Sequence, residues 1–238
     1  MKEPGTDSQS LPPICCSAVC TAYESWASTE GKQFINLQSH GGITNRDKWI
    51  GDFRSYWKLR NTLNSAAKEA AVKWVFVTAI PKLRAAKSIT IVAELVTEMA
   101  DRKLSSKQGD AKSHSRQTSF ISKLGVVINP TLFAPYDSFA LDAINDLSAK
   151  KILAHDYEQF IERFNDLLGK YDAQLSKIVA SDLRSFACAR QAKQICSDWK
   201  TRFPSRAEAV VMKRRVLDKH LWRIGKAATL GGGIGAQL

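Results

Sequence analysis

The chain of 238 residues has few of the side chains that build metal centres, with four histidines and five cysteines. Because five is an odd number, the cysteines cannot all pair within one chain. Cys15, Cys16 and Cys20 stand close together, but adjacent cysteines chelate a single ion poorly and no histidine is near. Cys188 and Cys196 have no further pair after them. The sequence therefore predicts buried thiols, with no metal and no cofactor.

Membrane and phosphate-loop signals are also missing. The chain has no run of about 18 uninterrupted apolar residues, and its start lacks a basic segment followed by a long apolar one. The glycines at 231–233 are not followed by the Lys-Ser/Thr and helix of a phosphate loop. No Ser-His-Asp order or carboxylate pair suggests a second active site. We expect a cytoplasmic protein with no membrane partner.

Basic residues are abundant and unevenly distributed. The formal net charge is +12, and 44% of the residues are hydrophobic, which is enough to fill a core. Residues 101–123 hold six Lys or Arg against two acids, and residues 200–226 hold nine against two. Such clusters are usually solvated faces, but together they can also form one electropositive groove for a nucleic acid. A nucleic acid is the predicted partner, and an acidic protein is an alternative.

The apolar spacing predicts an all-α fold. Residues 1–10 and 229–238 are polar or glycine-rich and are expected to be disordered or flexible. Residues 11–228 are expected to form one helical domain; a division into two lobes, 46–150 and 11–45 with 151–228, is the alternative. Helices are predicted from Arg46 onward, with Trp49, Phe53, Trp57 and Leu63 on one side, and at 66–79, 85–100, 155–170, 172–184, 185–201 and from about 205 to 228.

Two of these predicted helices contain residues typical of strands. Val75-Phe76-Val77 and Ile89-Thr90-Ile91-Val92 are rich in β-branched side chains, which fit a pleated sheet. The Ala, Lys and Glu residues around them favour a helix. Ile80-Pro81 is expected to separate the two helices.

The stretch TSFISKLGVVINPTLFAPYDSFALDAI, from Thr118 to Ile144, sets a lysine and an aspartate at the two ends of a helix-turn-helix unit. Ser119 or Ser122 can cap a short buried helix that Asn129-Pro130 ends. Asp137 then stands at the N-terminus of a second helix that continues through Leu147. By spacing alone, Asp137 is an ordinary helix cap and Lys123 a solvated amine. The functional alternative is an amine nucleophile, activated by partial desolvation, beside an aspartate.

The strings S-F-I-S-K, N-P and F-x-P-Y-D-S-x-A resemble the catalytic segment of the helix-hairpin-helix DNA glycosylases, in particular small bacterial proteins of the 8-oxoguanine glycosylase fold. In that family a lysine attacks the sugar C1′ and a helix-capping aspartate assists. The resemblance implies that these catalytic residues are Lys123 and Asp137. A second segment, Arg215 to Trp222 leading to Gly225-Lys226, is similar to the closing helix of these proteins, which packs the core.

The resemblance also implies DNA-binding side chains and a base pocket. The side chains expected to contact DNA are Lys107, Lys112, His114, Arg116, Lys213, Arg214 and Lys219. The aromatics nearest the catalytic pair, together with one on the closing helix, are candidates for stacking an extruded base; they are Phe120, Phe133, Tyr136 and Trp222. Aromatics at helical spacing mostly pack in a core, so each of the four has that simpler reading.

The predicted function is therefore that of a DNA N-glycosylase with AP-lyase activity, which removes a damaged or modified purine through a lysine Schiff base. The alternative is a catalytically inactive, basic helical nucleic-acid-binding protein, for instance of a bacterial antiviral system. The region from Lys103 to Gln117 favours that alternative, because it holds only Gly109 where a phosphate-binding hairpin needs several glycines. The sequence leaves open whether the DNA is single- or double-stranded and which oligomer forms.

Overall fold

The computed structural model describes residues 11–38, 43–59, 62–105, 111–148, 151–180 and 206–230. Within these ranges every regular element is a helix, which confirms the all-α class. The elements are α1 (Cys16–Ser25), η1 (Trp26–Glu30), α2 (Gly31–Gln38), α3 (Arg46–Tyr56), α4 (Lys68–Trp74), η2 (Val75–Ala79), α5 (Ile80–Ala85), α6 (Ile91–Asp101), α7 (Ala111–Ile128), α8 (Ser138–Asp146), α9 (Tyr157–Lys170), α10 (Asp172–Ala180) and α12 (Arg206–Thr229), where η marks a π-helix. None of these helices is long and apolar enough to cross a membrane.

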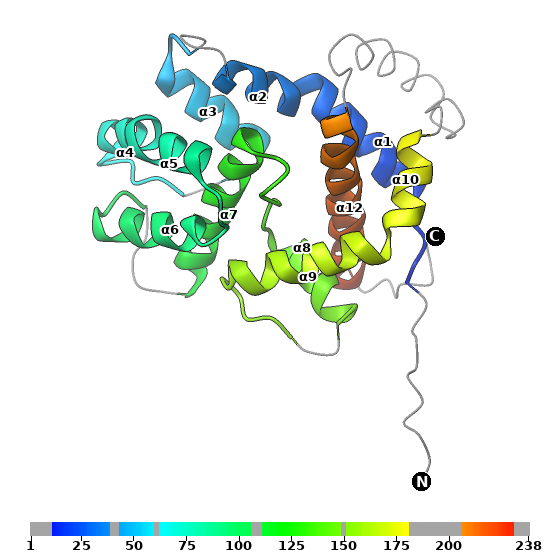
Figure 1. Ribbon diagram of the computed structural model, residues 1–238. Helices are drawn as coiled ribbons and strands as arrows, with labels where there is room; N and C mark the ends of the chain where they lie inside the picture. The colour runs from blue at the N-terminus through cyan, green and yellow to red at the C-terminus, as the bar shows by residue number, and fades with distance from the viewer. Residues whose placement is uncertain are drawn as a thin grey trace.

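The helices form two groups, one around α7 and the other around α12 (Figure 1). In the first group α7 packs against α5 and α6, and α3 and α4 lie beside them. In the second group α12 runs through the middle and packs against α1, α8 and α10. The continuous rod of α1, η1 and α2 joins the groups, because α2 also packs against α7.

One hydrophobic cluster extends through both groups. The side of α3 that the sequence assigns to the core is buried, with Trp49 stacked on Phe53 at a ring-centroid distance of 5.2 Å. Gly225 allows α12 to approach α8 very closely, because a Cβ atom there would overlap the carbonyl oxygen of Phe139. This close contact fixes the position of α8, which begins right after Asp137.

The helix that carries Lys123 is longer than predicted. It begins at Ala111 rather than at Ser119 or Ser122, so neither serine is its cap. Ser122 Oγ instead donates to the Ser119 carbonyl oxygen, 3.2 Å away, as a serine within a helix does. The good helix formers before it, such as Lys112, Arg116 and Gln117, extend the helix upstream. The predicted end is confirmed, since α7 stops at Ile128.

The chain from Lys68 to Ala85 is one continuous helical rod, and the predicted break at Ile80-Pro81 is wrong. Proline has no N–H and cannot donate to the preceding turn. The π-helical turn η2 lies directly before it and changes the hydrogen-bond spacing there. The next helix, α6, starts at Ile91 rather than 85. Helix was the correct choice for Val75–Val77, which lie in η2, and for Ile91-Val92, which lie in α6, whereas Ile89 and Thr90 form a turn before α6.

Several other predicted boundaries agree with the structure. The helix α3 begins at Arg46, where Asn45 accepts from the Lys48 N–H, and α12 ends at Thr229. The predicted helix at 155–170 is α9, which starts at Tyr157 after the Asp156 cap. The predicted helix at 185–201, residues 181–184 and both chain ends lie outside the described residues.

Candidate catalytic site around Lys123

Lys123 lies on the buried side of α7, with 7% of its surface exposed. The neighbouring helix residues, from Phe120 to Ile128, are all buried, so the aliphatic stem of the lysine packs in the core. Its Nζ atom is 5.9 Å from the centroid of the Trp57 ring, which comes from the end of α3. Lys123 is therefore an interior amine, and the reading as a solvated surface lysine is wrong.

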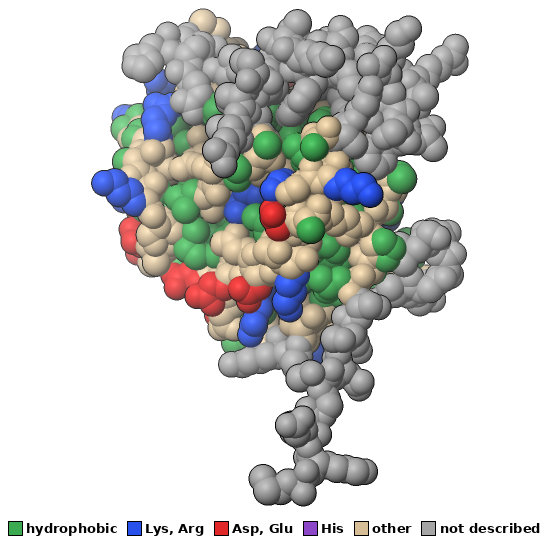
Figure 2. Space-filling model, turned by 45° about the vertical axis from the view of Figure 1, so that its right-hand side comes forward, with side chains coloured by type: hydrophobic (Ala, Val, Ile, Leu, Met, Phe, Trp, Pro, Cys, Tyr) green, Lys and Arg blue, Asp and Glu red, His purple; other side chains and the backbone are tan. Residues whose placement is uncertain are grey.

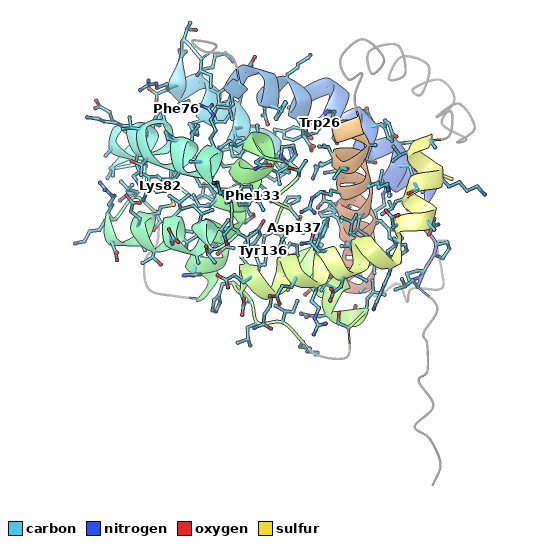
Figure 3. The ribbon with its side chains drawn as sticks, in the orientation of Figure 1. Trp26, Phe76, Lys82, Phe133, Tyr136 and Asp137 are labelled. Carbon is cyan, nitrogen blue, oxygen red and sulfur yellow. The ribbon has the colours of Figure 1, made fainter. Side chains whose placement is uncertain are left out.

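Asp137 is the N-cap of α8, as predicted. Its backbone is extended, and its Oδ1 accepts a hydrogen bond of 2.9 Å from the Ala140 N–H. The turn before it is tied to α7, because the Tyr136 N–H donates to Ser122 Oγ at 3.0 Å. Figure 3 shows Phe133, Tyr136 and Asp137 along this turn, with Asp137 on the side that faces α12. The serine that precedes Lys123 thus fixes the segment that presents the aspartate.

A buried network of ion pairs joins α12 to η1 close to Lys123. Arg215 donates from Nε to Glu30 Oε2 at 2.7 Å, from a terminal nitrogen to Glu30 Oε1, and from its other terminal nitrogen to Asp218 Oδ2 at 2.9 Å. Glu30, Arg215 and Asp218 are each at most 3% exposed. Lys219 adds longer contacts of 3.8 Å to Glu30 and 3.6 Å to Asp218. Glu30 is the last residue of a π-helix, a rare element that often marks functional sites.

The Trp57 ring is the common neighbour of three cations. Lys123 Nζ and Lys219 Nζ are each 5.9 Å from its centroid, and Arg215 Cζ is 5.4 Å away. The indole N–H donates to Gln33 Oε1 at 3.3 Å, which holds the ring in place. An aromatic face attracts cations and tolerates them without hydration. Trp57 is therefore the shared aromatic neighbour of three basic side chains, of which Lys123 and Arg215 are buried.

The pKa of Lys123 is lowered. Burial is the largest cause, because it disfavours the charged ammonium, and the positive charges of Lys219 and Arg215 act in the same direction. The negative charges of Asp137 and Asp218 oppose the shift without cancelling it. The amine is therefore neutral, and so able to attack a carbon atom, at a lower pH than an ordinary lysine. The mutual influence of these groups also shows that Asp137 and Asp218 lie near the amine.

The pKa values of the two carboxyl groups in the network are shifted in opposite directions. Burial raises the pKa of Glu30, but the charges of Arg215 and Lys219 outweigh it and leave a lowered value. Burial also raises the pKa of Asp218, and there it outweighs the attraction of Arg215. Glu30 is thus the firm anionic partner of Arg215, and Asp218 is the carboxyl group that takes up a proton more readily.

Lys123 differs from its cationic neighbours in its partners. Arg215 and Lys219 each have carboxylate partners within 4 Å, whereas Lys123 has no ion pair or hydrogen bond among the described residues. Its amine is influenced by Asp137 through space, and no direct bond to a carboxylate holds it. An amine placed in this way keeps its lone pair available for a reaction.

Of the side chains predicted to bind DNA, Lys219 lies beside Lys123, whereas His114, Lys213 and Arg214 have other neighbours. His114, on α7, has its ring 5.0 Å from that of His155, and burial, followed by the charge of His155, lowers its pKa. It precedes Lys123 by nine residues, a rise of roughly 13 Å along the helix. Arg116 is partly exposed on the same helix. Lys107 and the side chain of Lys112 lie outside the described residues.

The predicted DNA contacts on α12 have protein partners in this structure. Lys213 pairs with Asp172 at 2.7 Å. Arg214 is 6% exposed, donates to Asn165 Oδ1 at 2.8 Å and packs over the Phe164 ring at 5.2 Å. Lys219 belongs to the ion network. A role in DNA binding stays a prediction for each of them.

The aromatics proposed for a base pocket are mostly core residues. Phe120 is fully buried and packs edge-on against Phe53 at 5.9 Å. Phe133 is 1% exposed and lies over Gly125 of α7. Tyr136, also 1% exposed, packs against Phe160 at 5.1 Å and accepts the His155 N–H at 2.8 Å.

Trp222 is more open than the other three. It is partly exposed on α12, with Phe139 edge-on at 5.6 Å and Lys226 Nζ 4.8 Å from its ring centroid. The structure thus gives all four aromatics protein neighbours, and their contact with a base stays a prediction.

Four site residues were missed by reading the sequence, namely Glu30, Trp57, Arg215 and Asp218. Arg215 and Asp218 are three residues apart, so they share a face of α12 between apolar neighbours such as Met212 and Leu221. Two charged residues at helical spacing within an apolar stripe were a usable signal. Assigning this segment only to core packing was incomplete. Glu30, 185 residues away from Arg215 in the chain, had no comparable signal.

Charged groups are mixed on the face shown in Figure 2. Lys and Arg side chains are scattered among apolar ones, and acidic side chains gather along the lower left. At the site itself three basic side chains, those of Lys123, Arg215 and Lys219, lie with three acidic ones, those of Glu30, Asp137 and Asp218. Around Lys123, the described residues therefore form a charge-balanced cluster rather than a one-sided basic groove.

Comparison of the chain with models of protein families, with curated proteins and with solved structures finds no match in any of the three.

Proposed function

We propose that the protein is a DNA N-glycosylase with AP-lyase activity, in which the Lys123 amine attacks the sugar of a damaged or modified nucleotide. One observation carries the proposal: a lysine that is 93% buried, with a lowered pKa, lies beside Asp137 and has no ion-pair partner among the described residues. Burying an amine without an ion-pair partner costs free energy, and groups with strongly shifted pKa values cluster at functional sites. A purine is the expected base, by the resemblance of residues 119–140 to the 8-oxoguanine class.

The reaction starts from the neutral amine. Lys123 Nζ attacks C1′ of the deoxyribose, and the C1′–N9 bond breaks, so that its electron pair leaves with the base, which takes up a proton from water. The new secondary ammonium loses a proton to Asp137. The nitrogen lone pair then opens the sugar ring, O4′ receives that proton, and an iminium ion, the Schiff base, remains. Elimination of the 3′ phosphate from this intermediate is the lyase step.

Asp137 suits this role because of its position at the helix N-terminus. One carboxylate oxygen is held by the Ala140 N–H, which fixes the orientation of the group. The negative charge favours the cationic sugar that develops as the base leaves. Its influence on the Lys123 pKa places it within electrostatic reach of the same amine.

The Glu30–Arg215–Asp218 network has a positioning role in this proposal. It attaches the middle of α12 to η1 and keeps the positive charges of Arg215 and Lys219 next to Lys123. Those charges help to keep the amine neutral. None of the three network residues needs to contact the sugar.

The alternative is a nucleic-acid-binding protein that lacks the chemistry. It is favoured by the helical conformation of residues 111–117, which form the first part of α7 where the resemblance leads one to expect a hairpin. A duplex would then not be held by the glycine-rich turn typical of the family. Salt-sensitive DNA binding without a covalent adduct is the outcome that this alternative predicts.

The test is borohydride trapping. The purified protein is incubated with end-labelled DNA that contains a single 8-oxoguanine, uracil or abasic site, in single- and double-stranded form, and borohydride is added. Reduction of the iminium ion gives a stable protein–DNA bond. We expect an adduct with wild-type protein, its loss in Lys123→Gln, and DNA binding close to that of wild type in the variant.

Lys219→Gln is the matched control, because Lys219 lies at the same Trp57 ring but is already paired with carboxylates. This variant is expected to keep the adduct but to form it more slowly at neutral pH, because the charge of Lys219 helps to lower the pKa of Lys123. Undiminished trapping in Lys123→Gln, or trapping that depends on Lys219 instead, would end the assignment of Lys123. No adduct with any substrate, together with retained DNA binding, would favour the binding protein.

The role of Asp137 is tested by Asp137→Asn. Asparagine is about as good an N-cap as aspartate, so the free energy of unfolding should change by only a few tenths of a kcal/mol, while turnover should fall strongly because the charge is gone. Asp156→Asn is the control, since Asp156 caps α9 in the same way, through the Gln159 N–H. If both variants lose equal stability and neither changes turnover, Asp137 is only a cap.

A further inference from the structure

One face of α12 carries basic and aromatic side chains that lead from the Lys123 site to the surface. They are spaced by four, three and four residues, which puts them within an arc of about 60° around the helix; they are Arg215, Lys219, Trp222 and Lys226, and we call them the α12 stripe. Arg215 is 2% exposed and the Lys219 side chain 19%. Trp222 is partly exposed, and Lys226 is exposed. The α12 stripe therefore runs from the interior to solvent.

The inner end of the α12 stripe belongs to the site around Lys123. Lys219 Nζ and Lys123 Nζ lie over the same Trp57 ring, each 5.9 Å from its centroid. Lys219 is also paired with Asp218 at 3.6 Å, so it already has a carboxylate partner. The outer half of the α12 stripe, Trp222 and Lys226, is the part that is open to a ligand.

The Trp222 ring is fixed beside the turn that presents Asp137. Phe139, two residues after Asp137, packs edge-on against it at a centroid distance of 5.6 Å. The close crossing of α8 and α12 at Gly225 keeps the two helices in this arrangement. Lys226 Nζ lies 4.8 Å from the centroid of the Trp222 ring and has no ion pair among the described residues. A lysine on a flexible stem can move aside, so this ring can accept another flat group.

A partly exposed aromatic ring next to an unpaired lysine is the combination that single-stranded DNA requires. Proteins that bind unpaired strands stack bases on aromatic rings and contact phosphates with basic side chains. In a duplex each base is already stacked between its neighbours and does not reach a protein ring. The rise along the helix from Lys219 to Lys226 is about 10 Å, which is the length of about three stacked nucleotides.

We propose that the substrate reaches Lys123 as a single strand, and that a base next to the reacting nucleotide stacks on Trp222 while Lys226 contacts a phosphate. This inference rests on the proposed glycosylase function, because it names the form of DNA that the Lys123 site takes. Trp222 is a positioning residue, since it holds the strand and touches no reacting atom. Stacking also supplies affinity where the charges around Lys123 balance.

The test is equilibrium binding without chemistry. Three fluorescein-labelled probes are titrated with the full chain, and binding is followed by fluorescence anisotropy. The probes are an oligothymidylate, the same strand paired with oligoadenylate, and a base-free strand of the same length made of tetrahydrofuran abasic residues. We expect the wild-type protein to bind the single strand more tightly than the duplex and more tightly than the base-free strand, because only unpaired bases can stack on Trp222.

Trp222→Leu removes the stacking surface. Binding to the single strand should weaken by about 5- to 150-fold, the range expected for the loss of one stacked base. Binding to the base-free strand should not change, because that strand has nothing to stack. Trp222→Phe, which keeps a smaller ring, should give a smaller loss and serves if Trp222→Leu does not fold.

Lys226→Gln removes the phosphate contact and, as a change at an exposed residue, should leave the fold intact. The slope of log Kd against log salt concentration should fall by about 0.7, as for the loss of one phosphate contact in a single strand. Phe76 and Arg46 are the matched controls, because they form the same kind of pair, with Arg46 Cζ 5.2 Å from the ring centroid, and Phe76 lies away from α12 (Figure 3). Phe76→Leu and Arg46→Gln should bind all three probes as the wild type does.

This binding assay separates the inference from the glycosylase chemistry. The predicted pattern supports the single-strand role of the α12 stripe whether or not borohydride traps an adduct. Tighter binding of the duplex, equal binding of the base-free strand, or an unchanged affinity of Trp222→Leu and Trp222→Phe for the single strand would overturn it, even if an adduct forms at Lys123.

Discussion

Replacing Glu30 by glutamine should be among the most damaging single changes to the fold. Glu30 is completely buried and supplies both carboxylate oxygens to Arg215, which is itself 2% exposed. The substitution leaves a buried guanidinium without its main counter-charge. Removing one partner of such a pair typically costs about 3–5 kcal/mol, a large part of the total stability of an ordinary domain.

Asp218→Asn is the matched control for this prediction. Asp218 is also buried and also accepts from Arg215, but burial raises its pKa, so the neutral form is the one its surroundings favour. Asparagine resembles that neutral form and can still accept the hydrogen bond. We expect a cost of about 1 kcal/mol or less.

The assay is urea unfolding followed by circular dichroism. With a slope of about 3 kcal/mol per molar urea, a loss of about 4 kcal/mol lowers the midpoint by roughly 1.3 M, whereas Asp218→Asn should move it by less than about 0.3 M. If Glu30→Gln moves the midpoint no more than Asp218→Asn does, the Glu30–Arg215 pair does not make a large contribution to the free energy of unfolding.

Two further predictions concern the acid range and the helix crossing. Because the pKa of Glu30 in the folded protein lies below the ordinary 4.5, the contribution of Glu30 to stability is fully present above that value and is lost as pH falls through the lowered pKa. The difference in unfolding free energy between wild type and Glu30→Gln should therefore shrink on acidification. A difference that stays constant down to about pH 2 would contradict the lowered pKa. Gly225→Ala should destabilise the protein by about 1–3 kcal/mol, because the cost of the overlap with the Phe139 carbonyl exceeds the gain in helix propensity. Gly51→Ala on α3, whose new Cβ atom would meet nothing within 4 Å, should stabilise the protein by up to about 1 kcal/mol. Equal effects of the two variants in thermal unfolding would be evidence against the close α8–α12 crossing.

Much of the local structure follows from the sequence. Asp137 is a cap because aspartate accepts from the first-turn N–H groups, and α7 ends before Asn129-Pro130 because proline restricts the residue before it. The start of α7 was placed too late because two serines within the helix were read as caps. The break at Pro81 was wrong because a π-helical turn absorbs the missing hydrogen bond.

The surroundings of Lys123 were beyond local reasoning. The spacing of residues 118–144 brings Lys123 and Asp137 together, but burial of the amine depends on α3, η1 and α12, which are remote in sequence. Only the Arg215/Asp218 pair could have been noticed in the sequence, as two charges on an apolar helix face.

The central claim is that the folded protein keeps the Lys123 amine neutral at a lower pH than an ordinary lysine. Its most direct test is the titration of Lys123 by NMR, after reductive methylation with carbon-13 formaldehyde and assignment of the signal by its absence in Lys123→Gln. We expect a pKa clearly below 10.5 and a further decrease in Asp137→Asn, because the carboxylate that favours the ammonium is gone. A pKa at or above 10.5, unchanged by Asp137→Asn, would contradict it.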